Sequence, residues 1–218
     1  MVALLHKRNR DQIPRRDELG DLRFRKLLSA SSWATLPAAV KTRFSKRLSA
    51  GGTVVFAGVV TEVRISRLGC LLGQALRMIG APLPLFRDVG VPTVVTVTED
   101  AKSGGQIWSR MYCNRAGFPQ VIHSAKQFSG PTGLEEFIGC GISMALNVEA
   151  SDEGLTFTSA GYFLKLAGRR LALPKFLSPG RVTVKHTALA NGEFEFSLVV
   201  QHPLFGELIQ QSAVYHDQ

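Results

Sequence analysis

The sequence predicts an α+β protein that is mainly antiparallel β, built as a strongly curved sheet or barrel-like meander with one or two N-terminal helices packed on it. Three observations support this class. From Pro92 onward, apolar residues recur at every second position, which is the period of a β-strand. Short segments rich in Gly, Pro and Asn separate these runs, as turns do. Two segments before Pro92 show the helical period instead.

Two helices are predicted, one on each side of a strand at Thr53–Ile65. The first, Leu36–Arg47, has Pro37 in its first turn and an apolar residue at every fourth position, which places these residues on one face. The second shows the clearest helical pattern in the chain, and Gly80 ends it. Its apolar stripe, which we expect to pack in the core, consists of Leu68, Leu71, Leu72, Ala75, Leu76 and Ile79.

Eight further strands are predicted at Thr93–Glu99, Gln106–Cys113, Gln120–Phe128, Leu134–Glu149, Leu155–Leu166, Arg181–Leu189, Glu193–Gln201 and Glu207–His216. Asn191-Gly192 is the strongest hairpin signal, because both residues tolerate the positive φ of a type I′ turn. Strands joined by short turns pair antiparallel. A sheet of this many twisted strands tends to curl or close, since open edges are a liability.

Gly139-Cys140-Gly141 resembles the start of a dinucleotide fingerprint, but Met144 occupies the third glycine position. The fingerprint also requires a strand, a turn and a helix in succession, whereas this segment has the pattern of a strand. We therefore interpret the two glycines as a bulge or a bend in one long strand.

Length and charge divide the chain into two parts. Its 218 residues suit one domain plus an arm, and we assign residues 1–32 to a basic N-terminal extension and 33–218 to a single β-rich domain. The formal net charge is +9. The segment Lys7–Lys26 holds eight Lys and Arg against four Asp and Glu. The remainder shows no basic cluster interleaved with aromatic residues, so specific nucleic-acid binding is not expected. A weak peripheral membrane contact through the basic arm, at Leu22–Leu28, is the alternative to a loosely docked extension.

Chemistry that depends on a cofactor or a metal has no support in the sequence. No P-loop, G-x-S-x-G or H-E-x-x-H motif occurs, so we predict no cofactor and no metal site. Cys70, Cys113 and Cys140 are scattered, which favours small core residues over a disulfide framework. No apolar run reaches the length of a membrane span. The N-terminus has the wrong order of apolar and basic residues for a secretory signal, and we expect a cytoplasmic protein.

The candidate site centres on Trp108, Arg110 and Tyr112, which share one face of a predicted strand. Two interpretations are equally supported. The row lines a pocket in which Arg110 anchors a carboxylate or an enolate, or it forms an external stripe in which Arg110 stacks between the rings.

Other strands carry further candidates. His123 lies on a mostly apolar row and is either a satisfied core residue or a base. Glu135 and Glu136 point to opposite sides of their strand, so at most one of them faces the interior, where it would pair with Arg110. Tyr162 follows Gly161, at which a ligand or a backbone could approach closely.

A set of short motifs is spread from about Leu36 to Tyr215: Trp108-x-Arg110-x-Tyr112, Ser124, Leu134-x-Glu136 or its neighbour Glu135, Leu171-Ala172-Leu173-Pro174, Gly192-x-Phe194-x-Phe196 and His202-Pro203-Leu204-Phe205-Gly206. In these motifs the stretch resembles the bacterial "domain of unknown function 4166" family, which is often found alone or fused behind a saccharopine-dehydrogenase-like reductase. The family usually has Phe at the position of Tyr112, and Gly is expected at that of His216. The resemblance implies a role near small-molecule metabolism but no defined activity, and this chain lacks a nucleotide-binding half.

Three functions follow from these residues. The first is a binding domain for an apolar or amphipathic small molecule in a β-lined pocket, with ligand contacts from Trp108, Arg110, Tyr112, Ser124, Glu135 and Tyr162. The second is a cofactor-independent enzyme (an isomerase, cyclase or hydrolase of a lipid-like or natural-product substrate) with catalytic candidates Arg110, Glu136 and His123. The third is an accessory domain of a reductase partner. An acid or base beside Arg110 inside the cavity would favour the enzyme.

Overall fold

The computed structural model describes residues 20–45, 52–78, 80, 83–100, 102–167, 169–174 and 177–217. Its helices are the short 3₁₀ helix η1 (Arg25–Leu27), α1 (Ala30–Thr35), α2 (Ala38–Phe44) and α3 (Arg67–Met78), with a 3₁₀ turn η3 at Ala190–Gly192. Its strands are β1 (Thr53–Ile65), β2 (Pro92–Asp100), β3 (Gly105–Tyr112), β4 (Gln120–Gln127), β5 (Glu135–Gly139), β6 (Ile142–Ala150), β7 (Gly154–Leu166), β8 (Arg169–Ala172), β9 (Arg181–Ala188), β10 (Glu193–His202) and β11 (Gly206–Asp217).

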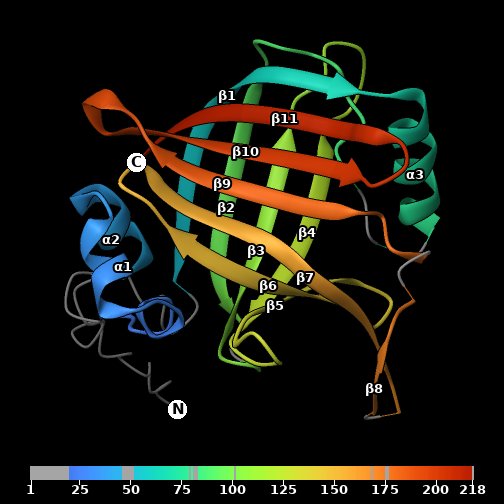
Figure 1. Cartoon of the computed structure of the whole chain (residues 1–218). Coiled ribbons are helices and arrows are strands. Elements are labelled where there is room, and N and C mark those ends of the chain that lie inside the picture. Colours follow the sequence, from blue (N-terminus) through green and yellow to red (C-terminus); the bar gives the residue numbers. More distant parts are fainter. Residues whose placement is uncertain are drawn as a thin grey trace, which may run out of the picture.

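Ten of these strands form a closed antiparallel barrel (Figure 1). The order around the ring is β1, β2, β3, β4, β5, β6, β7, β9, β10 and β11, and β11 pairs with β1 to close it. β8 pairs with β7 outside the ring. Within the ring, the strands therefore follow one another in sequence order. The predicted barrel-like meander is confirmed, and closure leaves the ten strands of the ring without a free edge.

Strand prediction was wrong at two places. The predicted strand Leu134–Glu149 is two strands, β5 and β6, because Gly139, Cys140 and Gly141 all have positive φ and form the tight turn of a hairpin. β8 was not predicted. The Asn191-Gly192 turn is present with positive φ at both residues, and both belong to the 3₁₀ turn η3 within the four-residue connection between β9 and β10.

The N-terminal helices cover one end of the barrel (Figure 1). The ring of Phe24 packs edge-on against Phe44 of α2 and against Phe128, which follows β4, with centroid distances of 5.0 and 4.9 Å. Phe44 in turn contacts Phe157 on the inner wall. Phe24 is thus buried in this end of the barrel and Leu27 and Leu28 are half-buried there, while Leu22 is exposed. The membrane contact at Leu22–Leu28 stays a prediction. Residues 1–19 lie outside the described residues, and the domain boundary at residue 33 stays a prediction.

Helix α3 crosses the opposite end of the barrel (Figure 1). Its first turn lies against β11, where Gly69 touches the carbonyl group of Leu208. Just after the helix, Gly80 lies beside Gly139 and Cys140 of the β5–β6 turn. The buried residues of α3 are Gly69 and Gly73. The expectation that its apolar stripe packs in the core was therefore wrong: Leu72 and Leu76 are half-buried, while Leu68, Leu71 and Ala75 are exposed, and Ile79 is not described.

The three cysteines do not share one environment. Cys70 and Cys113 are half-buried beside core residues, but Cys140 is exposed in the β5–β6 turn, contrary to expectation. Within the described ranges, no helix is long and apolar enough to cross a membrane.

Candidate functional site

A cavity of about 150 Å³ lies inside the barrel. Inward side chains of the walls line it together with Leu76 of α3 and the following residues Leu83 and Pro84. The cavity therefore reaches the end of the barrel that α3 crosses. Most of its lining is apolar, as at Val95, Ile122, Met144, Leu146, Val184 and Phe196. Charged side chains are concentrated on the wall formed by β3, β4 and β5.

Trp108, Arg110 and Tyr112 all line this cavity. Trp108 and Tyr112 are buried, and the side chain of Arg110 is 22% exposed. Of the two interpretations of this row, the inward one agrees with the structure. The guanidinium carbon of Arg110 lies 5.6 Å from the centre of the Trp108 ring, so the indole also supports the cation.

A hydrogen-bonded network joins Arg110 to the neighbouring strands. Nη1 of Arg110 donates to Oγ of Ser124 on β4 over 3.0 Å, and Ser124 donates to Oε1 of Glu136 on β5 over 2.6 Å. Nη2 of Arg110 lies 3.5 Å from the same carboxylate oxygen. The other oxygen, Oε2, accepts from Nζ of Lys126 over 2.7 Å. Two cations and one carboxylate thus share a buried site.

Burial and charge act in opposite directions on these groups. Burial raises the pKa of Glu136, but the positive charges of Lys126 and Arg110 outweigh it and lower that pKa to about 2. Glu136 is therefore ionised at neutral pH. Burial lowers the pKa of Lys126; Glu136 counteracts this and Arg110 adds to it. Each buried charge loses its hydration and needs an opposite charge to replace it. One carboxylate therefore compensates the two cations only in part.

A second polar group faces the cavity from β11. The side chain of Gln211 is buried there, and among the described residues neither its amide oxygen nor its nitrogen has a well-formed hydrogen bond. Its polar neighbour is Tyr112: burial raises the phenol pKa, and the charge of Arg110 and a weak hydrogen bond with Gln211 lower it to a smaller extent. The amide is thus poorly satisfied, and the loss of good hydrogen bonds by a buried amide costs up to about 1–3 kcal/mol, part of which a polar group inside the cavity would recover.

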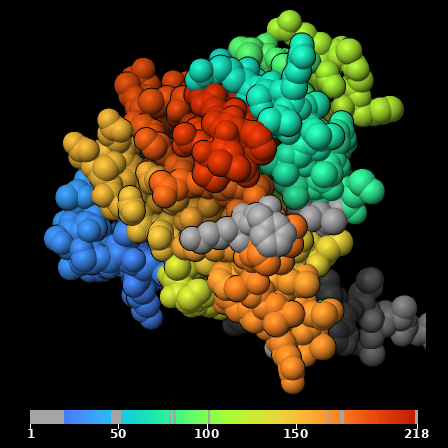
Figure 2. Space-filling view, turned by 45° about the vertical axis from the view of Figure 1, so that its right-hand side comes forward, coloured from blue at the N-terminus to red at the C-terminus, as the bar shows by residue number. Residues whose placement is uncertain are grey.

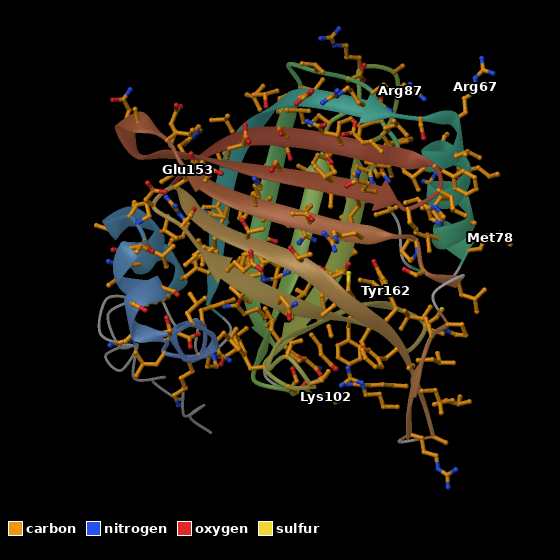
Figure 3. The ribbon with its side chains drawn as sticks, in the orientation of Figure 1. Arg67, Met78, Arg87, Lys102, Glu153 and Tyr162 are labelled. Carbon is orange, nitrogen blue, oxygen red and sulfur yellow. The ribbon has the colours of Figure 1, made fainter. Side chains whose placement is uncertain are left out.

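Tyr162 on β7 also lines the cavity, and its hydroxyl donates to the carbonyl oxygen of Gly180 over 3.0 Å. Burial raises its pKa to about 12, so the phenol stays protonated. Because the hydroxyl proton of Tyr162 is already donated to Gly180, Tyr162 shapes the cavity wall and does not offer a free hydrogen-bond donor. Figure 3 places it on the barrel wall, between the two covered ends.

Two predicted site residues lie on the outer side of the wall. Glu135 is fully buried, but it pairs with Lys165 and Arg170 of the β7–β8 hairpin, so of the two acids only Glu136 faces the interior. The side chain of His123 is exposed, and its Nδ1 lies 2.9 Å from Oγ of Ser109. Strand alternation directs both side chains away from Arg110.

Sequence reasoning missed Lys126 and Gln211. Lys126 had a usable signal, because it follows Ser124 by two positions and therefore shares its face. Gln211 had none, since its position near Tyr112 depends on the pairing of β11 with β1 that closes the barrel. Across the described ranges, no three His, Cys, Asp or Glu side chains gather closely enough to hold a metal ion.

These features define a class of protein: a closed ten-stranded antiparallel barrel that encloses a mostly apolar cavity with a charged network on one wall. The family model described as Domain of unknown function (DUF4166) matches residues 36–214. The chain belongs to this family, as its motifs predicted. The match begins just before α2 and ends within β11, so it spans the barrel and α3. No curated protein matches the chain.

Proposed function

We propose that this barrel binds a small amphipathic anion, with the apolar body in the cavity and a carboxylate or similar group against Arg110 and Lys126. The observation that carries the proposal is the charge imbalance of the buried network, in which two cations meet one carboxylate. An anion placed there would stabilise both cations in their charged forms. The poorly satisfied amide of Gln211 supplies a further polar contact.

The cavity volume limits the ligand. About 150 Å³ is comparable to an engineered protein cavity that binds benzene, whereas pockets for drug-sized ligands measure roughly 300–1,000 Å³. A benzene-sized acid fits the resting barrel. A longer chain requires Leu76 and the rest of α3 to move away from the barrel end.

The enzyme hypothesis receives less support. Glu136 does lie beside Arg110, which was the expected mark of an enzyme. However, a carboxylate with a pKa of about 2 is a weak base at neutral pH, because a general base works best with a pKa near the operating pH. His123 borders the cavity, but its exposed side chain bonds to Ser109 on the outer side of the wall. A reductase partner and a cytoplasmic location stay predictions.

The test uses three probes of equal ring size: benzoate, benzyl alcohol and benzylamine. Calorimetry and ligand-observed NMR would measure their affinities, and native mass spectrometry of the freshly purified protein would detect a retained acid. We expect benzoate to bind most tightly and benzylamine most weakly. Arg110→Met should weaken benzoate binding roughly tenfold or more, while leaving the Lys126–Glu136 pair intact.

Arg25→Met is the matched control, since Arg25 is an exposed residue of η1 at the other end of the barrel. It should leave all three affinities unchanged. Equal affinity for the three probes, or benzoate binding that survives Arg110→Met, would contradict the proposed anion site.

A further inference from the structure

Helix α3 presents an apolar ridge to solvent. Its glycine face is the seated one, because Gly69 touches Leu208 and Gly73 touches Leu85. Part of the predicted apolar stripe is consequently turned outward, with Leu68 46% and Leu71 68% exposed, and Met78, in the last turn but outside that stripe, is 88% exposed. Figure 3 shows Met78 and Arg67 projecting away from the barrel.

Two turns continue this ridge on either side of α3. The β10–β11 turn exposes Leu204 and Phe205, and it lies next to the start of the helix because Gly69 packs on Leu208. The β7–β8 hairpin exposes Leu166 and Leu171. It adjoins the β5–β6 turn where α3 ends, since Gly141 lies against the carbonyl of Lys165. Figure 2 shows α3, the β10–β11 turn and the β7–β8 hairpin on one side of the molecule. We call this the mouth face; its apolar residues are Leu68, Leu71, Met78, Leu166, Leu171, Leu204 and Phe205.

The mouth face is strongly basic. The described residues of segments 67–78, 166–174, 177–181 and 203–208 include five arginines and one acid. The arginines are Arg67, Arg77, Arg169, Arg170 and Arg181, and the acid is Glu207. Arg170 pairs with Glu135, and Glu207 lies 3.8 Å from Arg64. The exposed apolar side chains thus stand among arginines with little acidic compensation.

We propose that the mouth face docks on the surface of an anionic lipid bilayer. The apolar side chains project from a helix and two turns rather than lining a groove, so they suit insertion into a soft interface. The arginines around them match the negative surface potential of anionic lipids. Exposed apolar side chains gathered on one side of a domain also mark an interaction site.

Docking here would place the cavity next to the lipid. Leu76 lines the cavity from the inner side of α3, while Leu71 and Met78 lie on its exposed side. This step rests on the proposed function. If the barrel binds an amphipathic anion, the membrane would be the source or destination of that ligand, which would pass beneath α3.

Vesicle co-sedimentation tests the docking. Vesicles of phosphatidylcholine alone and of phosphatidylcholine with phosphatidylglycerol would be mixed with the full chain at low and high NaCl. We expect binding to the mixed vesicles that weakens with salt. Leu71→Ser with Met78→Ser should lower the partition coefficient roughly tenfold or more, and Arg67→Gln with Arg77→Gln should do the same at low salt only.

The controls lie at the opposite end of the barrel: Leu189→Ser in the β9–β10 turn and Arg25→Gln in η1. Both should bind like the unmodified chain. The docking proposal is overturned if the unmodified chain stays in the supernatant, or if the control variants lose as much vesicle binding as the mouth-face variants. It is also overturned if light scattering shows that Leu71→Ser with Met78→Ser breaks a dimer of this chain while vesicle binding is unchanged.

Benzoate binding, measured on the same proteins as vesicle binding, separates the docking proposal from the proposed anion site. If vesicles bind and benzoate does not, the docking stands and the anion site fails. The reverse result leaves the anion site and overturns the docking. All the substituted side chains are exposed, so circular dichroism should show an unchanged fold.

Discussion

The ammonium of Lys126 and the carboxylate of Glu136 lie 2.7 Å apart inside the barrel, and this ion pair is nearly closed to solvent. Arg110 approaches the same carboxylate through Ser124. Glu136 is thus the only negative charge among the described residues whose side chains face the cavity, and it holds two cations near each other.

Removal of that charge should be costly. Glu136→Gln would leave Arg110 and Lys126 buried without an anion, and loss of one partner of a buried pair typically costs about 3–5 kcal/mol. Urea unfolding at pH 7 measures the free energy of unfolding. Glu149→Gln, an exposed residue on β6, is the control and should change it by no more than about 0.5 kcal/mol. Equal stability of the two variants would show that the carboxylate does not hold the network.

The same carboxylate should make the free energy of unfolding fall at acid pH. The folded pKa of Glu136 is about 2, below its ordinary value of 4.5, so the unfolded state binds the proton more readily. The stabilisation is therefore fully present above pH 4.5 and is lost as the pH falls toward 2; it amounts to roughly 3 kcal/mol. Unfolding curves for the unmodified chain and Glu136→Gln should converge over that interval. Curves that stay parallel would place the effect on another group.

Gln211 should be a site where stability and binding oppose each other. Gln211→Met keeps the length of the side chain and removes the poorly satisfied amide, so the free energy of unfolding of the unliganded protein should rise by about 1 kcal/mol. Benzoate affinity should fall if the amide contacts the ligand. Gln201→Met, at an exposed position of β10, is the control for both measurements. A loss of stability in Gln211→Met would indicate that the amide is paired in solution.

The packing of α3 on the barrel should depend on Gly69 more than on Gly73. A Cβ at position 69 would overlap the carbonyl group of Leu208, whereas one at position 73 would meet the end of the Leu85 side chain, which can move. Gly69→Ala should destabilise the protein by about 1–3 kcal/mol and speed amide hydrogen exchange in α3. Gly73→Ala should be close to neutral, since alanine favours a helix over glycine by about 1 kcal/mol. Similar exchange rates in both variants would argue against this packing.

The strands were predictable because period-two alternation and turn residues are local signals. The inward face of each strand was not. On β4 one row holds Val121 and His123 and the other holds Ser124 and Lys126, and the more polar row is the buried one. A charged network inside the barrel inverts the usual pattern, in which polar residues face solvent.

The prediction that the apolar stripe of α3 packs in the core was wrong for a related reason. Its leucines have the pattern of a buried stripe, yet the helix rests on Gly69 and Gly73, whose missing side chains allow a close approach to Leu208 and Leu85. A hydrophobic pattern identifies the apolar face of a helix but does not identify what covers it. The β5–β6 turn was missed because Cys140, which has φ of 44°, is not a residue type that signals a turn.

The seam between β1 and β11 bears on how the protein folds. Most strands of the ring pair with a neighbour across a short turn and can form early, but Ile65 pairs with Ile209, and almost the whole β-region lies between them. Bringing these residues together costs loop-closure entropy that local contacts do not repay, so the last step of folding should be slow. Until the seam forms, β1 and β11 are open edges beside an exposed apolar interior, and the unclosed chain is the species most prone to aggregate.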